Sequence, residues 1–171
     1  MNANSQQRDE RFQNLLDNYA PALRRLCAAH RRVAQDQQDL FQEIAVALWT
    51  ALPNFRGDSS ERTWLYRIAH NVAFTDAARR ERGQNKEAPI EEAPPLTTTD
   101  QEQRANLLDA VRRLASMEQQ LALLYLEGLT TKEIAEVLGI TEGNAAVRLT
   151  RLRQRLTAIL NPKETQHERS R

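Results

Sequence analysis

Basic and aromatic side chains alternate along one stretch of the sequence, residues 55–82, and this combination could bind nucleic acid. Of its arginines, Arg67 and the late Arg79, Arg80 and Arg82 can neutralise phosphates. Asn71 and Thr75 add hydrogen-bonding groups with little charge. The aromatic residues of the stretch are Phe55, Trp64, Tyr66 and Phe74. Unstacked bases can lie on aromatic or guanidinium planes, so the stretch favours a surface for single-stranded nucleic acid. The alternative is an amphipathic helix whose basic face is only solvated.

A turn and a helix must position these side chains. Gly57 predicts a turn, and Asp58 with Glu61 three residues later predicts a helix N-cap. An apolar face is expected from the helical spacing of Leu65, Ile68, Ala69 and Val72. The opposite side is expected to carry Thr63, Arg67, Asn71, Thr75 and Ala78.

A second stretch, residues 130–156, has the pattern of a helix-turn-helix. Thr130 or Thr131 is expected to cap a short helix, Gly139 to make the turn and Thr141 to cap the next helix. The inner face of the short helix is predicted to hold Ile134, Ala135, Val137 and Leu138, with Ile140 at the corner. The second helix is expected to be anchored by Val147, Leu149 and Leu152.

The second helix of such a motif normally lies in the major groove of DNA. Its first turn would present Glu142, Asn144, Ala145 and Arg148 to base edges. Phosphate contacts are expected from Arg148, Arg151 and Arg155, which would fix register rather than sequence. A three-helix bundle whose arginines are only solvated is the alternative.

Composition favours an all-α fold, and the length allows one domain or two small ones. The chain has 171 residues with 24 Lys and Arg against 23 Asp and Glu, so its net charge indicates no partner. Glycine is scarce and helix-forming residues dominate. The single cysteine, Cys27, lies in phase with Leu23 and Leu26 and is expected to be buried. The polar N-terminus and the lack of a long apolar run predict a soluble, cytoplasmic protein without membrane insertion.

The first domain is predicted over residues 10–83 and consists of helices. Residues 1–9 are expected to fray, and Pro21 to kink the first helix or divide it in two. A polar connection is expected over residues 31–38. The next helix, from Asp39 to Trp49, should end before Pro53. Its outer side carries Asp39, Gln42 and Glu43, which either keep the helix solvated or form a docking face.

Residues 84–101 are predicted to be an acidic linker, because they contain Pro89, Pro94 and Pro95 and no helical period. The second domain is then expected over residues 102–160. Its first helix has a stripe of Leu107, Leu108, Val111 and Leu114. Its second helix, with Leu121, Leu124 and Tyr125, should end at Gly128, before the helix-turn-helix.

Taken together, the two domains resemble an extracytoplasmic-function (ECF) sigma factor of bacterial RNA polymerase. The resemblance runs from about residue 10 to residue 160. In the first domain it rests on D-L-F-Q-E-I-A-V-A-L-W-T-A-L-P-N-F-R-G and T-W-L-Y-R-I-A-H-N-V-A. In the second it rests on L-T-T-K-E-I-A-E-V-L-G-I-T-E-G-N and R-L-T-R-L-R.

The resemblance implies a role for each surface. The residues implied to grip the polymerase β′ clamp are Asp39, Gln42, Glu43 and Trp49. The loop and helix implied to read and melt the −10 element contribute Phe55, Arg56, Asp58, Ser59, Ser60, Arg67, Asn71, Thr75, Arg79 and Arg80, with Asn71 and Thr75 at base-contacting positions. The helix-turn-helix would read the −35 element. The linker would pass through the polymerase interior toward the RNA exit path, contacts to the β subunit are implied, and an anti-sigma factor is expected as a partner.

The sequence departs from the family pattern at three positions. Ala146, followed by Val147, stands where a basic residue is usual, which permits contact with a thymine methyl group and not an arginine–guanine pair. Glu61 stands where an aromatic or apolar residue is frequent, and Ser116 replaces a common proline.

Two other functions stay open from the sequence: a stand-alone helix-turn-helix regulator, and a helical adaptor that binds only protein. An enzyme is the least expected, because His30, His70 and His167 are scattered and no metal-spaced cluster or phosphate-binding loop occurs. Asp39 and Glu43 could bind a cation, but two carboxylates on a helix are more often solvated. No cofactor or metal is expected.

Overall fold

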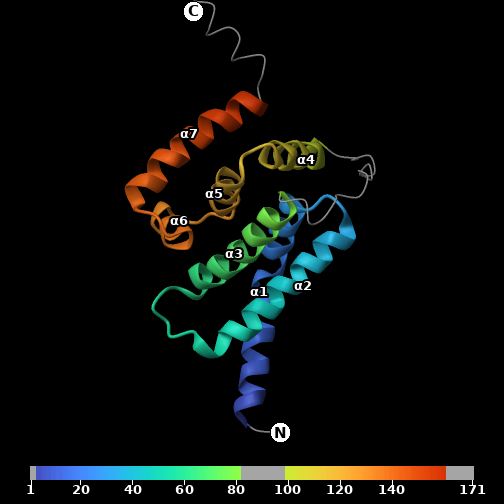
Figure 1. The fold of residues 1–171 in the computed structure, drawn as a ribbon, viewed down its shortest axis with the longest axis vertical. Helices are drawn as coiled ribbons and strands as arrows, with labels where there is room; N and C mark the ends of the chain where they lie inside the picture. Colours follow the sequence, from blue (N-terminus) through green and yellow to red (C-terminus); the bar gives the residue numbers. More distant parts are fainter. Residues whose placement is uncertain (1–2, 82–98, 161–171) are drawn as a thin grey trace, which may run out of the picture. The chain divides into compact units, whose positions relative to one another are not determined.

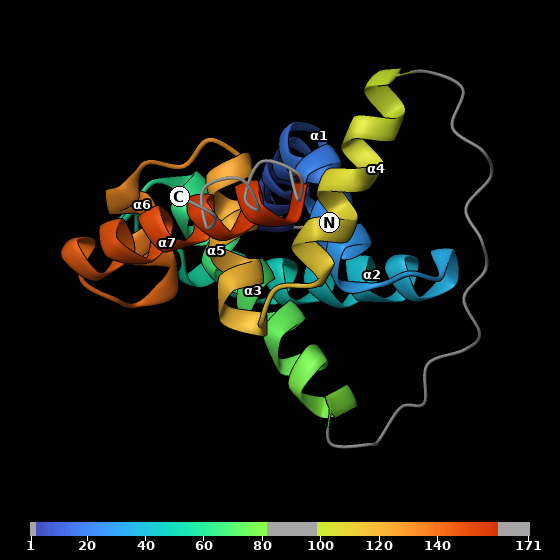
Figure 2. The same ribbon diagram turned by 90° about the horizontal axis from the view of Figure 1, so that it is seen from above.

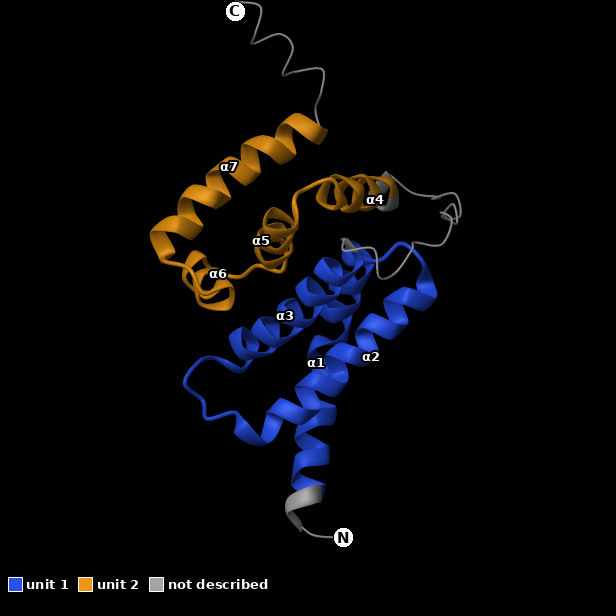
Figure 3. Cartoon of the chain, viewed as in Figure 1, with its two compact units in different colours: residues 1–91 blue, residues 92–171 orange. Residues whose placement is uncertain are grey.

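The computed structural model describes residues 3–81 and 99–160, and all regular structure in these ranges is helical. Residues 1–91 and 92–171 form two compact units, coloured separately in Figure 3. The prediction of an all-α fold is confirmed. Within the described ranges, no helix has both the length and the hydrophobicity needed to cross a bilayer.

Unit 1 is built from three long helices, α1 (Ala3–His30), α2 (Ala34–Ala51) and α3 (Glu61–Glu81), with a short 3₁₀ turn at Leu52–Asn54. Each helix runs back along the one before it, and α2 contacts both α1 and α3 (Figure 1). The core forms where their apolar faces meet. Its largest fully buried side chains are Leu15, Leu23, Leu40, Ile44, Leu48 and Leu65.

The N-terminal half of α1 differs from the prediction. The helix already begins at Ala3, not near residue 10, and it continues through Pro21 as one element. Residues before 10 are fastened to the domain, since Arg8 Nη2 donates a hydrogen bond of 2.8 Å to the carbonyl oxygen of Trp49. A proline in a helix removes only its own hydrogen bond, and the packing of Leu15 and Leu23 on either side keeps α1 continuous.

Two further boundaries differ. The connection predicted over residues 31–38 is confined to residues 31–33, because α2 begins at Ala34. Ser60, not Asp58, caps α3: its Oγ accepts a hydrogen bond of 3.0 Å from the backbone N–H of Thr63. Most of the predicted linker, with Gly83 and the three prolines, lies outside the described residues, but residues 99–101 belong to a helix.

Unit 2 consists of α4 (Thr99–Arg112), α5 (Ser116–Leu126), α6 (Thr131–Leu138) and α7 (Glu142–Leu160). The last helix, α7, contacts each of the other three, and Figure 2 shows the same helices from above. The side chains that α6 and α7 bury are Ile134, Ala135, Val137, Ala145, Leu149 and Leu152.

The turn between α6 and α7 follows the predicted chemistry. Thr130 and Glu133 form a capping box at the start of α6. Gly139 adopts a left-handed conformation with φ of 66°, which glycine tolerates without strain. Thr141 Oγ1 then accepts a hydrogen bond of 3.3 Å from the backbone N–H of Asn144 at the start of α7. These features confirm the helix-turn-helix.

Candidate functional site

An exposed acidic and amide face runs along α2. Asp39, Gln42 and Glu43 are all exposed, and Asp39 Oδ1 accepts a hydrogen bond of 3.0 Å from Gln35 on the same helix. Val46 lies one helical turn beyond Gln42 and is 65% exposed. An apolar side chain that sits between polar neighbours in this way adds contact area to a docking face.

Trp49 lies apart from this face because α1 partly covers it. Its ring packs edge-on against Phe12, with the ring centroids 5.1 Å apart. The guanidinium of Arg8 lies 3.9 Å from the centroid of the Trp49 ring. Trp49 therefore joins α1 to α2, and any contact it makes with a partner uses only its uncovered edge.

The loop before α3 is held by an aromatic pair. Gly57 has φ of 80° and makes the turn. Phe55 packs on Trp64 with centroids 4.9 Å apart, and Arg11 lies 5.2 Å from the Phe55 centroid. The loop residues Arg56, Asp58 and Ser60 are exposed, and Ser59 is half-buried. The backbone of the loop is thus anchored by Phe55, while the side chains of Arg56 and Asp58 are exposed.

One face of α3 presents polar groups next to an exposed ring. Arg67, Asn71, Thr75 and Arg79 are exposed, and Phe74 among them is 40% exposed. Thr75 Oγ1 donates a hydrogen bond of 2.8 Å to the carbonyl oxygen of Asn71. Thr75 therefore meets an outside group mainly as an acceptor, whereas the Asn71 amide can both donate and accept.

Two residues of the predicted α3 surface have other roles. Thr63 is buried, and its Oγ1 lies 2.8 Å from Ser60 Oγ inside the cap of α3. Arg80 is ion-paired with Asp36 of α2 at 2.9 Å. This pair joins α2 to α3 and compensates the charge of Arg80.

A groove of about 350 Å³ lies between α2 and α3, lined by Glu43, Asn71, Val72, Thr75, Asp76 and Arg79. The groove brings residues of the two predicted surfaces together, since Glu43 belongs to the face on α2 and Asn71 and Thr75 to the face on α3. Asp76 is the buried residue among those that line the groove. This carboxylate is buried and ion-paired with Arg31, which is also buried.

Two histidines, the half-buried His30 and the buried His70, accompany the ion pair. Burial, together with the charge of Arg31, lowers the pKa of His30 to about 4. Burial, together with the proximity of His30, lowers the pKa of His70 to about 3. Burial raises the pKa of the Cys27 thiol to about 12, which makes it an unreactive part of the core, as predicted.

In unit 2 the exposed face of α7 differs in phase from the prediction. Ala145 is fully buried, so it cannot reach base edges as the sequence suggested. Val147, predicted to anchor the helix, is 52% exposed. Both errors have one cause. The buried Leu149 and Leu152 define the side of α7 that faces the core, and Ala145 lies on that side. Residues two apart on a helix differ by about 200° in direction, so Val147 lies on the opposite, exposed side.

The basic residues of α7 differ in whether they have a partner within unit 2. Arg148 Nε donates a hydrogen bond of 2.7 Å to Asn144 Oδ1, which fixes both side chains relative to each other. Arg155 is ion-paired with Glu118 of α5 at 2.5 Å, so the predicted phosphate contact would compete with this pair. Thr141, Glu142, Asn144 and Arg151 are exposed as predicted.

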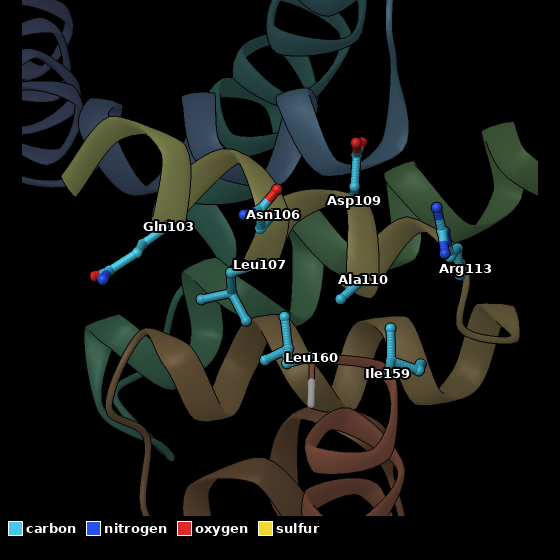
Figure 4. A pocket seen from close by; sticks show the side chains of 8 residues that line it. All are labelled: Gln103, Asn106, Leu107, Asp109, Ala110, Arg113, Ile159 and Leu160. Atoms are coloured by element: carbon cyan, nitrogen blue, oxygen red, sulfur yellow. The ribbon is translucent and has the colours of Figure 1, made fainter. Parts of the chain in front are cut away.

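A second groove, of about 560 Å³, lies in unit 2 where α4 meets the end of α7. It is lined by Gln103, Asn106, Leu107, Asp109, Ala110, Arg113, Ile159 and Leu160 (Figure 4). No residue of the predicted surfaces lines it. Within residues 3–81 and 99–160, no group of three or more His, Cys, Asp or Glu side chains gathers in a way that could hold a metal ion.

Comparison with known families assigns both units. Residues 15–83 match Sigma-70 region 2, and residues 104–156 match Sigma-70, region 4. RNA polymerase sigma-H factor of Pseudomonas aeruginosa is 33% identical over 145 residues, which cover 75% of each chain. The chain is an ECF-type sigma factor of the sigma-70 family.

Other relatives and solved structures agree with this assignment. ECF RNA polymerase sigma factor SigM of Mycobacterium tuberculosis is 29% identical over 153 residues, covering 87% of this chain and 76% of SigM. CnrH in complex with the cytosolic domain of CnrY has a TM-score of 0.68 at 24% identity, covering 91% of this chain and 90% of that one. RpoE of Bartonella quintana in complex with the anti-sigma factor NepR has a TM-score of 0.71 at 22% identity, covering 90% and 99%. At these identities the two structures show a shared fold.

The sigma factor therefore acts in transcription initiation and is not itself catalytic, as the sequence indicated. Sequence reasoning missed two features of its surfaces: the exposed Val46 on α2 and the outward direction of Val147 on α7. Both could have been found from helical phase alone, since each lies opposite the buried leucines of its helix. The ion pairs of Arg80 and Arg155 had no signal in the sequence.

Proposed function

We propose that unit 1 binds the β′ clamp of core RNA polymerase through α2 and reads the −10 element through the 55–60 loop and α3, while α7 of unit 2 reads the −35 element. The observation that carries the proposal is the difference in composition between two faces of unit 1, which adjoin at the groove lined by Glu43, Asn71 and Thr75. The α2 face is acidic and has an apolar centre at Val46, whereas the α3 face combines arginines with an amide, a hydroxyl and an exposed ring. The first composition suits a protein partner, and the second suits DNA.

The division of the chain into these roles follows the two matched regions. Residues 10–83 would bind the polymerase and the −10 element, residues 84–101 would connect the domains and pass through the polymerase interior, and residues 102–160 would bind the −35 element and the β subunit. In unit 2, Asn144 and Arg148 are held together by their hydrogen bond, which supports a preformed contact to base edges. Arg151 would contact a phosphate.

An anti-sigma factor is the further partner we propose. Two proteins that share the fold were solved in complexes, CnrH with the cytosolic domain of CnrY and RpoE with the anti-sigma factor NepR. A regulator of this kind would cover the same exposed faces that the polymerase uses. A sigma factor that acts on polymerase and promoter DNA would work in the cytoplasm.

Reconstitution with core polymerase from the same source tests the two faces of unit 1 separately. Reversing charge at Asp39 and Glu43 together, to Arg, should weaken core binding at least tenfold, because two carboxylates on the docking face become cations. The matched control reverses Glu10 and Asp17, two exposed acids of α1, and should leave core affinity unchanged. Equal core affinity for both double variants would remove the docking assignment.

Asn71→Ala tests the DNA face. It removes a base-reading amide that the fold does not bury, so open-complex formation on a cognate promoter should fall roughly tenfold while core binding stays intact. Permanganate footprinting measures the open complex, and core affinity is measured in parallel. Loss of core binding to the same extent would contradict a base-reading role. Tight duplex binding by the chain alone, without core binding, would instead indicate a stand-alone regulator.

A further inference from the structure

The exposed face of α7 is centred on an apolar side chain. Ala145, Leu149 and Leu152 face the core, and Val147 points directly away from them with half of its surface exposed. Thr150 lies one helical turn further along the same side and is also exposed. Val147 therefore contributes less to the core of unit 2 than the buried Leu149 and Leu152, and its exposed half is available to a partner.

Gly143 precedes Val147 by one helical turn, and nothing within the fold requires a glycine at this position. It lies in the first turn of α7, and its φ is not in the positive range that calls for glycine. A Cβ built at Gly143 meets no atom within 4 Å. The fold would therefore accept alanine here, and alanine is the better helix former. A glycine that neither packing nor backbone conformation requires is typical of a place where another molecule approaches the backbone closely.

Polar groups flank this centre and define how DNA would lie on it. Asn144 and Arg148 are hydrogen-bonded to each other at 2.7 Å, and Arg151 is exposed one turn beyond. These groups can contact bases and phosphates at the edge of the face. The centre itself carries no charge and no donor long enough to reach a guanine.

We propose that Val147 is a specificity-determining residue that contacts thymine methyl groups in the major groove of the −35 element, and that Gly143 lets the helix approach closely enough for this contact. The proposal rests on the −35 role given to α7 above. The methyl group of thymine is the apolar feature of the major groove, and small apolar side chains are its usual partners. The −35 element of this sigma factor should accordingly contain thymine opposite Val147.

Deoxyuridine provides the test, because it differs from thymidine only by the missing methyl group. The holoenzyme, formed from the full chain and core polymerase, first selects its −35 element from promoter fragments randomised in that region. Each thymine of the selected element, on either strand, is then replaced by deoxyuridine, and holoenzyme affinity is measured. At one or two positions the replacement should weaken binding about fourfold, the value expected for one buried methyl group.

Substitutions in α7 test whether the loss of affinity on deoxyuridine depends on Val147. Val147→Ala should weaken binding to the thymine promoter and reduce the difference between thymine and uracil, because it removes the two γ methyl groups of valine. Thr157→Ala, which also removes a β-branched side chain from an exposed position of α7, should keep the difference. Deoxyuridine without effect at every position, or an undiminished thymine preference in Val147→Ala, would overturn the proposal. Failure to select any −35 element would overturn the −35 role itself, and the inference with it.

Gly143→Ala separates a role in DNA binding from a role in the fold. The free energy of unfolding of unit 2 should stay the same or rise, while −35 affinity should fall at least about fivefold, because the added methyl group stands between helix and DNA. Unchanged DNA affinity would refute the close approach. A loss of stability would show instead that the glycine serves the fold.

Discussion

Removing the carboxylate of Asp76 should destabilise unit 1 more than any change on its surface. Asp76 and Arg31 are 4% and 5% exposed and form an ion pair that joins the end of α1 to α3. Asp76→Ala leaves the guanidinium of Arg31 in the interior without its carboxylate. Breaking one side of a buried pair costs about 3–5 kcal/mol, which is a large part of the 5–15 kcal/mol that typically stabilises a domain. For a domain of this size, such a loss corresponds to a fall in Tm of roughly 12 °C or more.

The two tryptophans make this measurement specific to unit 1. Trp49 and Trp64 are the only tryptophans of the chain, and both lie in unit 1. Tryptophan fluorescence in urea therefore follows the unfolding of unit 1, while far-UV circular dichroism follows both units. Asp17→Ala, which removes an exposed carboxylate of α1, is the matched control and should change the free energy of unfolding by less than about 0.5 kcal/mol.

A double variant identifies the source of the loss. Replacing Arg31 by Met and Asp76 by Leu removes both charges at once, and such replacements of buried pairs are often neutral or stabilising. The double variant should therefore recover most of the stability that Asp76→Ala loses. A single variant within 1 kcal/mol of the wild type would refute the reasoning. A double variant as unstable as the single one would show that the loss comes from packing and not from the isolated charge.

Two further predictions concern charge. The pKa values of His30 and His70 are lowered to about 4 and about 3, so the unfolded chain binds protons below pH 6.5 that the folded chain does not. The free energy of unfolding of unit 1 should thus fall from pH 6 to pH 4.5 by about 2–3 kcal/mol per pH unit, and His70→Gln should roughly halve this slope; a flat profile in tryptophan fluorescence would contradict it. In salt titrations of holoenzyme bound to a promoter, Arg151→Ala should reduce the slope of log affinity against log salt by about one. Arg155→Ala should reduce it less, because Arg155 is already paired within unit 2, and equal effects would disprove the distinction.

The helix-turn-helix could be predicted from sequence because short-range signals determine it. Thr130 with Glu133, Gly139 and Thr141 each act within four residues, and the structure realises every one of them. The same holds for the glycine turn at Gly57. Caps and turns depend on the chain's immediate neighbours, so their residue types carry the information directly.

Composition alone could not predict where α1 begins or which side of α7 is exposed. A polar N-terminal segment predicts fraying, but Arg8 reaches Trp49, which is 41 positions away in the sequence, and holds the segment in place. On α7 the buried Leu149 and Leu152 determine which way every other residue points. Treating Val147 as a third anchor assigned an apolar residue to the core by its type, although its helical phase places it outside.

The distribution of charge is what the sequence could least reveal, and it bears on how this sigma factor binds promoters. Arginines that looked equivalent are not, because Arg80 is paired with Asp36, 44 positions away, and Arg155 with Glu118, 37 positions away. Among the described residues of the proposed DNA faces, the exposed cations outside these ion pairs are Arg56, Arg67 and Arg79 in unit 1 and Arg151 in unit 2.

Each phosphate contact releases about one counterion, so the few cations of each unit give weak, salt-sensitive binding. Two units that each bind DNA weakly bind tightly together when they are held at the spacing of the −10 and −35 elements. Once the first unit has bound, binding of the second is an intramolecular step. We therefore expect the isolated units to bind promoter DNA weakly and the polymerase to supply the affinity by fixing their separation.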